Sequence, residues 1–218
     1  MNGKTILAAL ALVPSLALAQ LQPMPPPTQR STNWQFAVRS AYAVPFGKST
    51  SASGDELSQV IKSDIPLALE VNYRLNDEVY LGGMFQYGFG SLSSPLAAAC
   101  AGGSCSASTL RFGVNAFWHV SPKKQLDPWL GIGMNYEQLK VSANGPGGSD
   151  DLTISGFEFL NMQFGVDFQA SHLFAVGPYM SAGLGQYVHV DAGGTSGDIS
   201  NKAAHGWLNF GLKMTFNP

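Results

Sequence analysis

From Trp34 onwards, bulky apolar residues alternate with small or polar residues at a period of two. In the first such segment, Trp34, Phe36 and Val38 alternate with Gln35 and Ala37. This period is typical of β-strands that present one face to an apolar environment and the other to a polar one. A tilted strand needs ~9–11 residues to cross a membrane. Eight segments of about this length occur, at 34–44, 65–74, 79–89, 110–120, 130–137, 160–169, 176–185 and 208–216.

The connections between these segments alternate between long and short ones. Outer-membrane barrels have long extracellular loops and short periplasmic turns, and an even strand number brings both chain ends to the periplasmic side. We therefore predict an all-β fold over residues 34–218, an eight-stranded antiparallel transmembrane β-barrel. The expected long loops are 47–62, 91–107, 142–151 and 191–204, and the expected turns are 76–77, 121–127 and 171–172.

The alternation also predicts which side chains face outward. A soluble eight-stranded barrel would hold the bulky residues inside, but the other set consists of Gly, Ala, Ser, Asn, Gln and charged residues, which suits a polar lumen. The bulky set is therefore expected to face lipid, and it includes Phe36, Leu69, Phe112, Ile132, Val166 and Leu212. Outward aromatic residues near the short turns fit a membrane-interface girdle, namely Trp34, Tyr73, Trp118, Phe168 and Phe216, whereas Trp129 has inward parity.

Composition excludes two other classes of protein. Charged residues make up 12% of the chain, about half the fraction of a soluble domain. The mean hydropathy is only +0.05, and beyond the N-terminal segment no apolar run reaches the length of a membrane helix, which excludes a helical bundle. The formal net charge of −2 offers no basic surface for nucleic acid.

The N-terminus predicts export. One lysine, an apolar stretch and the sequence Ala17-Leu18-Ala19 precede Gln20, which is the pattern of a cleavable signal peptide. We expect a signal peptide at 1–19 with cleavage between Ala19 and Gln20, a Pro-rich periplasmic tether at 20–33, and the barrel in a Gram-negative-type outer membrane. The residue directly after the cleavage point is Gln20 rather than Cys, which argues against a lipoprotein anchor.

The two cysteines lie in the second long loop. Cys100 and Cys105 are separated by four residues, and an exported protein meets an oxidising compartment. We expect them to form a disulfide.

Six charged residues have inward parity and form the sharpest candidate site. The lumen of an eight-stranded barrel is just wide enough for side chains to fill it, and buried charges require partners. Two interpretations remain open, a paired polar core that plugs the barrel and a gated narrow pore. The expected pairs are Arg39 with Glu70, Arg111 with Glu137, and Asp167 with Lys213.

The last strand carries the most specific motif. Asn209, Gly211, Met214 and Phe216 form the pattern of a polar residue, Gly and two spaced hydrophobic residues that ends in an aromatic one. With this motif the chain resembles the OmpA/OmpX-like superfamily of small outer-membrane β-barrels. The resemblance implies outer-membrane lipids and the barrel-assembly machinery as partners, with a monomer favoured. Asn217 and Pro218 depart from the family pattern, in which the aromatic residue comes last.

Enzymatic and metal chemistry have weaker signals. Lipid A deacylases of this size carry a His-x-Ser motif, which His119-Val120-Ser121 matches, but the segment is expected at the periplasmic end, far from lipid A in the outer leaflet. His189 and His205 flank the last loop and are interpreted as solvated loop residues rather than metal ligands. We therefore expect no catalytic residue, metal or cofactor.

The predicted function is a non-enzymatic membrane anchor whose loops serve recognition or envelope integrity, with a narrow channel and a lipid A-modifying enzyme as alternatives.

Overall fold

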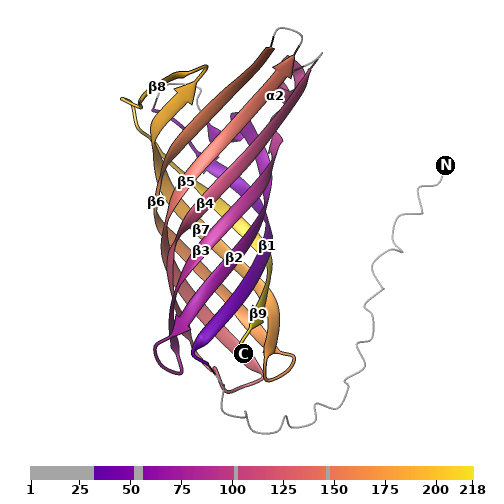
Figure 1. Ribbon diagram of the computed structural model, residues 1–218, viewed down its shortest axis with the longest axis vertical. Coiled ribbons are helices and arrows are strands. Elements are labelled where there is room, and N and C mark those ends of the chain that lie inside the picture. The colour runs from indigo at the N-terminus through magenta and orange to yellow at the C-terminus, as the bar shows by residue number, and fades with distance from the viewer. Residues whose placement is uncertain (1–31, 52–55, 101–102, 146–147) are drawn as a thin grey trace, which may run out of the picture.

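The computed structural model describes residues 32–51, 56–100, 103–145 and 148–218. Within these residues, eight long antiparallel strands form a closed barrel in the order β6-β5-β4-β3-β2-β1-β9-β7, and pairing of β6 with β7 closes it (Figure 1). The predicted signal peptide lies outside the described residues, as does the tether up to residue 31. The elements are β1 (Trp34–Gly47), α1 (Leu57–Val60), β2 (Ile61–Arg74), β3 (Val79–Leu92), α2 (Ser94–Ala99), β4 (Ser104–His119), β5 (Leu126–Gly145), β6 (Gly148–Gln169), β7 (Phe174–Ala192), β8 (Thr195–Asp198) and β9 (Ala204–Phe216).

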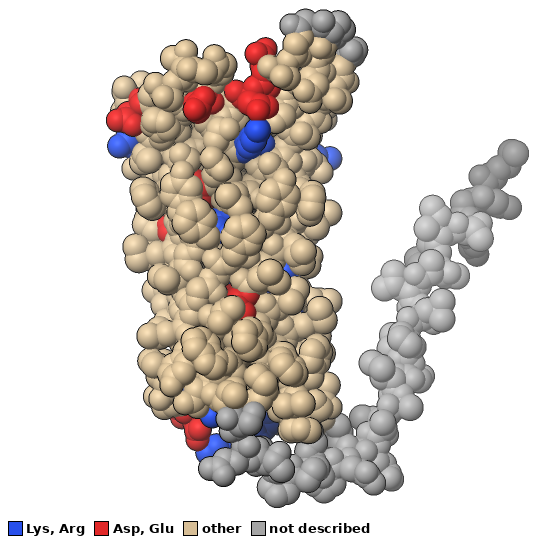
Figure 2. All heavy atoms as spheres, viewed as in Figure 1, with Lys and Arg blue, Asp and Glu red and all other residues tan. Residues whose placement is uncertain are grey.

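The outer wall of the barrel is apolar. Of the six residues predicted to face outward, Val166 is half-buried and the other five are at least 43% exposed. On the face that Figure 2 shows, most of the visible charged side chains lie near the two ends of the barrel, and the wall between them consists mostly of uncharged residues. An apolar wall around a closed sheet satisfies every backbone hydrogen bond without water, as lipid requires. The predicted transmembrane barrel is therefore confirmed.

The aromatic girdle lies at the end with the short turns. The rings of Trp34 and Tyr73 meet edge to face, with centroids 5.1 Å apart. Trp118 donates a hydrogen bond from Nε1 to Oε2 of Glu78 at 3.2 Å. An indole with one apolar side and one hydrogen-bonded edge suits the interface between lipid and water. Trp129, of inward parity, is buried.

All four predicted long loops contain more regular structure than expected. The helix α1 lies within 47–62, and α2 and the start of β4 lie within 91–107. The segment 142–151 is mostly a hairpin, because β5 and β6 stay paired up to Gly145 and Gly148. In the last loop, β8 pairs back onto β7. These extensions lie with α2 at the upper end of the barrel, opposite the C-terminus (Figure 1). At 20 and 22 residues, β5 and β6 are about twice as long as a membrane crossing requires.

At one height along the extended strands, the inward face changes from polar to apolar and the outward face changes from apolar to polar. Along β5 the inward row changes from Glu137 to Leu139, and the outward row changes from Met134 to Lys140. The same height on β6 is marked by Ile154, which pairs with Leu139 and is also buried. Above this height the barrel has an apolar inside and a polar outside, as a water-soluble β-structure has. The change therefore marks the outer limit of the membrane zone.

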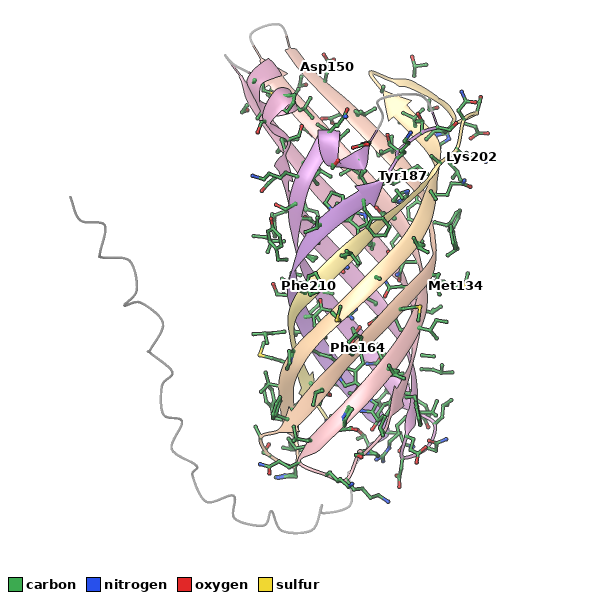
Figure 3. All side chains as sticks on the ribbon, turned by 180° about the vertical axis from the view of Figure 1, so that it is seen from behind. Met134, Asp150, Phe164, Tyr187, Lys202 and Phe210 are labelled. Carbon is green, nitrogen blue, oxygen red and sulfur yellow. A yellow bond between two sulfur atoms is a disulfide. The ribbon has the colours of Figure 1, made fainter. Side chains whose placement is uncertain are left out.

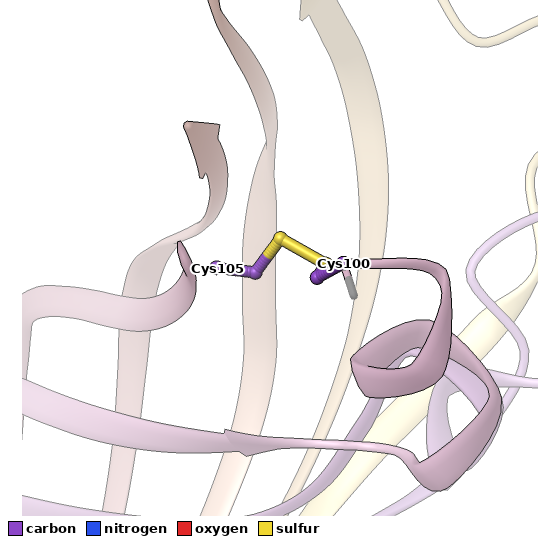
Figure 4. Close-up of a disulfide and its surroundings, with 2 residues drawn as sticks. All are labelled: Cys100 and Cys105. Atoms are coloured by element: carbon purple, nitrogen blue, oxygen red, sulfur yellow. A yellow bond between two sulfur atoms is a disulfide. The ribbon is translucent and has the colours of Figure 1, made fainter. Parts of the chain in front are cut away.

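Outside the membrane zone, a disulfide and an ion pair fasten the loops. Cys100 at the end of α2 is bonded to Cys105 at the start of β4 (Figure 4). Lys140 Nζ lies 2.8 Å from Asp151 Oδ2 across the β5–β6 hairpin, and the hydrogen bond from Lys140 lowers the pKa of Asp151. None of the described helices is long and apolar enough to cross a membrane.

Candidate functional site

The middle of the lumen contains the first predicted charge pair. Arg39 Nη2 lies 2.7 Å from Glu70 Oε1, and both side chains are almost completely buried. Arg39 also donates from Nη1 to Gln163 Oε1 at 2.5 Å, and its guanidinium carbon lies 5.0 Å from the ring centroid of Tyr179. The guanidinium of Arg39, on β1, thus contacts residues of β2, β6 and β7 within the lumen.

The second predicted pair lies nearer the outer end. Arg111 Nε is 3.3 Å from Glu137 Oε2, and the two residues are direct cross-strand partners. The Glu137 Oε1 atom accepts hydrogen bonds from the Tyr187 hydroxyl at 2.7 Å and from Trp207 Nε1 at 2.9 Å. His205 stacks on the Tyr187 ring at 3.8 Å. Tyr187 lies within the barrel near its outer end (Figure 3). The Glu137 carboxylate thus joins β5 to β7 and β9 through the lumen.

The third predicted pair requires a correction. Asp167 and Lys213 flank Gly177 as expected, since Gly177 pairs with Lys213, but the two charges form no direct ion pair within the described residues. Instead, Trp129 Nε1 donates to Asp167 Oδ1 at 2.9 Å. Lys213 Nζ lies 4.2 Å from the Trp129 ring centroid and 4.7 Å from that of Phe117. The physical reason is that the inward indole of Trp129 contacts both groups and replaces direct pairing with a hydrogen bond and a cation–π contact.

Charged residues other than the six predicted ones are also buried, among them Asp64, Asp127 and Glu158. Glu158 lies in the middle of the network and was missed by the sequence analysis. Its Oε1 accepts hydrogen bonds from Asn135 at 2.6 Å and from Asn161 at 2.7 Å. The pairing of β6 with β7 shifts register between Glu158 and Leu160, and this β-bulge reverses the parity of the residues that precede it. The signal in the sequence is the adjacent apolar pair Phe159 and Leu160, which interrupts the strict alternation.

These side chains leave little free space. The cavity between Arg39 and Arg111, lined also by Met84, Glu158 and Tyr179, measures about 10 Å³. A single water needs roughly 10–15 Å³. This part of the lumen therefore holds at most about one water.

The His-x-Ser motif lies at the periplasmic end, as expected. His119 Nδ1 is 2.7 Å from Asp127 Oδ2, and its ring lies 4.8 Å from that of Tyr80. Ser121 engages the same carboxylate through its backbone N–H at 2.9 Å. The carboxylate thus anchors the start of the β4–β5 turn.

The two histidines of the last loop are placed differently from each other. His189 Nδ1 lies 3.1 Å from Asp198 Oδ1 in an exposed pair. His205, expected to be solvated, is 1% exposed because β9 begins at Ala204 and turns the imidazole into the barrel. Over the described ranges, no group of three or more His, Cys, Asp or Glu residues could hold a metal ion.

The motif of the last strand lies on β9 between β1 and β7. Asn209 faces inward and donates from Nδ2 to Ser181 Oγ at 3.0 Å, whereas Met214 and Phe216 face outward. A Cβ on Gly211 would lie 2.1 Å from the Ser40 carbonyl oxygen, so glycine permits the close approach of β1 and β9. Recognition of the motif by the assembly machinery stays a prediction.

Comparison with known proteins gives a likeness in fold. No family model and no curated protein matches the chain. Among solved structures, the Neisserial surface protein A (NspA) matches with a TM-score of 0.50 at 14% identity over 86% of this chain and 98% of that one. The outer membrane protein OprG from Pseudomonas aeruginosa matches with a TM-score of 0.49 at 13% identity, over 86% of this chain and 98% of that one. Ail from Yersinia pestis matches with a TM-score of 0.44 at 10% identity, over 84% of this chain and 98% of that one.

At such identities, the likeness to NspA concerns the fold alone. It agrees with the apolar wall and the closed sheet, which identify a membrane barrel independently. The resemblance to small OmpA/OmpX-like outer-membrane barrels is thus confirmed as a fold.

Proposed function

We propose that this outer-membrane barrel is a non-conducting membrane anchor whose lumen is a solid polar core and whose outer end carries recognition. The observation that carries the proposal is the packing between the Arg39–Glu70 and Arg111–Glu137 pairs, where about 10 Å³ is free. A conducting lumen needs a continuous path in which ions exchange hydration water for protein ligands. Free space for about one water does not provide such a path.

The packing also supports the anchor proposal over a gated pore. To open the lumen, Arg39 would have to leave a carboxylate, an amide and an aromatic ring that come from three other strands. Separating a buried ion pair is strongly unfavourable unless water or new partners replace the lost contacts. The static core is therefore the simpler role for these charges.

An enzymatic function has less support. A nucleophile needs its base within hydrogen-bond reach and its substrate beside both. Ser121 contacts Asp127 through its backbone, and the His119 ring packs on Tyr80 at the periplasmic end of the barrel. Lipid A occupies the opposite leaflet.

Residence in the outer membrane, cleavage after Ala19 and a monomeric state belong to the same proposal. An apolar wall with an aromatic end suits lipid as the main partner. The long-loop end, with its disulfide and its hairpin extensions, is the part available to partners outside the cell.

The test is single-channel recording of the mature chain in planar bilayers. We expect no steady conductance from the wild type. A comparison variant changes Phe117→Ala and Trp129→Ala together, which removes the two rings around Lys213. It leaves the packing between the Arg39–Glu70 and Arg111–Glu137 pairs in place, so we expect it to stay non-conducting as well. Folding of both proteins is checked by the different electrophoretic mobility of unheated and heated samples. A steady wild-type conductance would refute the anchor proposal in favour of the channel.

A further inference from the structure

The outer end of the lumen contains an apolar cavity that the anchor function does not use. It measures about 260 Å³ and lies above the Glu137 layer, because Leu139 is the next inward residue on β5. Its lining is largely aliphatic, with Leu139, Val141, Leu152, Ile154, Val190, Val60 and Ile199 beside Ser49 and Thr50. Among the residues that the structure describes, none of those that line the cavity is charged.

The strand side of the cavity is lined by two rungs of paired inward residues. Leu139 pairs with Ile154, and Ile154 pairs with Val190, which forms an inner rung. Val141 pairs with Leu152 one rung further out. Successive inward residues on one strand are about 7 Å apart. The strand wall of the cavity therefore covers about this length, and residues of α1 and of the loops complete the lining.

The cavity is closed at its inner end and accessible at its outer end. Leu139 is 1% exposed, whereas Leu152 is 39% exposed. The strands of the wall stay hydrogen-bonded at this height, which leaves entry over the rim of the barrel. The pairing of β1 with β9 continues into the β1–β2 and β8–β9 loops at one side of the mouth. It continues through a Thr50–Lys202 bridge and a hydrogen bond from Ser51 N to the Asn201 carbonyl oxygen at 2.8 Å.

We propose that this cavity binds the end of a single saturated aliphatic chain, carried by a small uncharged amphiphile that enters from outside the cell. A dry apolar cavity of about 150 Å³ accommodates benzene, so a cavity of this size accommodates about ten carbon atoms. The branched aliphatic side chains that make up most of the lining favour an alkyl chain over a flat ring. The absence of charge among the lining residues favours an uncharged polar end, with Ser49 and Thr50 near the mouth.

The experiment uses 1-decanol with a diazirine near its methyl end. The mature protein is held in phosphatidylcholine nanodiscs, because detergents carry alkyl chains of their own. After photolysis, mass spectrometry locates the labelled residues. Lipid-facing residues such as Met134 should be labelled from the bilayer in every sample, which gives an internal reference. We expect saturable labelling of Leu139 and Ile154, reduced at least fivefold by unlabelled decanol.

Two variants control the interpretation. Val141→Trp fills the cavity from the inward row of β5 and should reduce labelling of Leu139 and Ile154 at least tenfold. Val114→Trp adds the same ring on the lipid-facing side, where Val114 is 65% exposed, and should leave the labelling unchanged. Val190→Trp replaces the first variant if that one fails to fold.

Three results would overturn the proposal. Labelling confined to lipid-facing residues shows that no chain enters. Undiminished labelling in a folded cavity-filled variant places the chain elsewhere. Equal labelling of Leu139 by a diazirine on a phosphatidylcholine acyl chain overturns entry of a free amphiphile from outside. Because these readouts do not involve conductance, they can fail or succeed independently of the proposed anchor function.

Discussion

The change Glu70→Ala gives the sharpest test of the sealed lumen. Glu70 is the carboxylate partner of Arg39 at 2.7 Å, and its side chain has no solvent exposure. Removing it leaves a guanidinium without its counterion in a region that holds at most about one water. Removal of one partner from a buried ion pair typically costs about 3–5 kcal/mol of unfolding free energy.

The structure places the expected value at the lower end of that range. Arg39 keeps its hydrogen bond to Gln163 and its contact with the Tyr179 ring after the substitution, and a desolvated cation–π contact stabilises by about 2 kcal/mol. We therefore expect a loss of about 3 kcal/mol for Glu70→Ala. The double variant Arg39→Ala with Glu70→Ala strands no charge, so it should recover part of the loss, with a coupling energy of about 2 kcal/mol.

The assay is urea unfolding in phospholipid bilayers, followed by tryptophan fluorescence, for the wild type, both single variants and the double variant. A matched control is available on the periplasmic turns, where Lys123 Nζ lies 2.6 Å from Asp77 Oδ2 and both side chains are more than half exposed. Lys123→Ala should change the unfolding free energy by about 0–1 kcal/mol. A similarly small effect of both Arg39 and Glu70 variants, with no coupling, would refute the argument that this pair is shielded from water.

Three further outcomes are expected. Intact-mass measurement of membrane-extracted protein should give a chain that begins at Gln20, and a mass that includes residues 1–19 would contradict the signal peptide. Alkylation without reductant should modify neither Cys100 nor Cys105, and quantitative modification would refute the disulfide. Trp129→Phe should lower the unfolding free energy by about 1–3 kcal/mol, because a buried carboxylate, Asp167, loses its donor. Unchanged urea unfolding of this variant would show that water replaces the indole.

Much of the membrane zone could be predicted from the sequence because lipid on one side and a narrow polar lumen on the other impose a strict period of two. Phe36 and Arg39 have opposite parity in the sequence and face opposite sides of the wall in the structure. Such a pattern also fixes the register, since a slip by one residue would turn a buried charge into the bilayer. The pairing of Arg111 with Glu137 could be anticipated for this reason.

The details of the lumen could not be predicted so well, because they depend on shape rather than on parity. The bulge at Phe159 brings Glu158 inside, and alternation counted from one end of β6 assigns that residue to the wrong face. Parity also places Asp167, Trp129 and Lys213 in the lumen without indicating that the indole contacts both charges. These contacts depend on the size of the ring and on the room beside it.

The prediction of a loop at 142–151 was wrong for a different reason, and that reason also explains the outer cavity. On β5 the apolar row passes from the outer face, at Met134, to the inner face, at Leu139 and Val141. A strand prediction based on bulky outward residues therefore ends at this point, although the strand itself continues to Gly145. Above the membrane the wall meets water on its outside, so the hydrophobic effect favours apolar residues within. Side-chain packing closes the polar core beneath, whereas the cavity above it is lined by the strands, by Val60 of α1 and by Ile199 of the β8–β9 loop. An apolar cavity at this height is therefore a consequence of where the membrane ends along the strands.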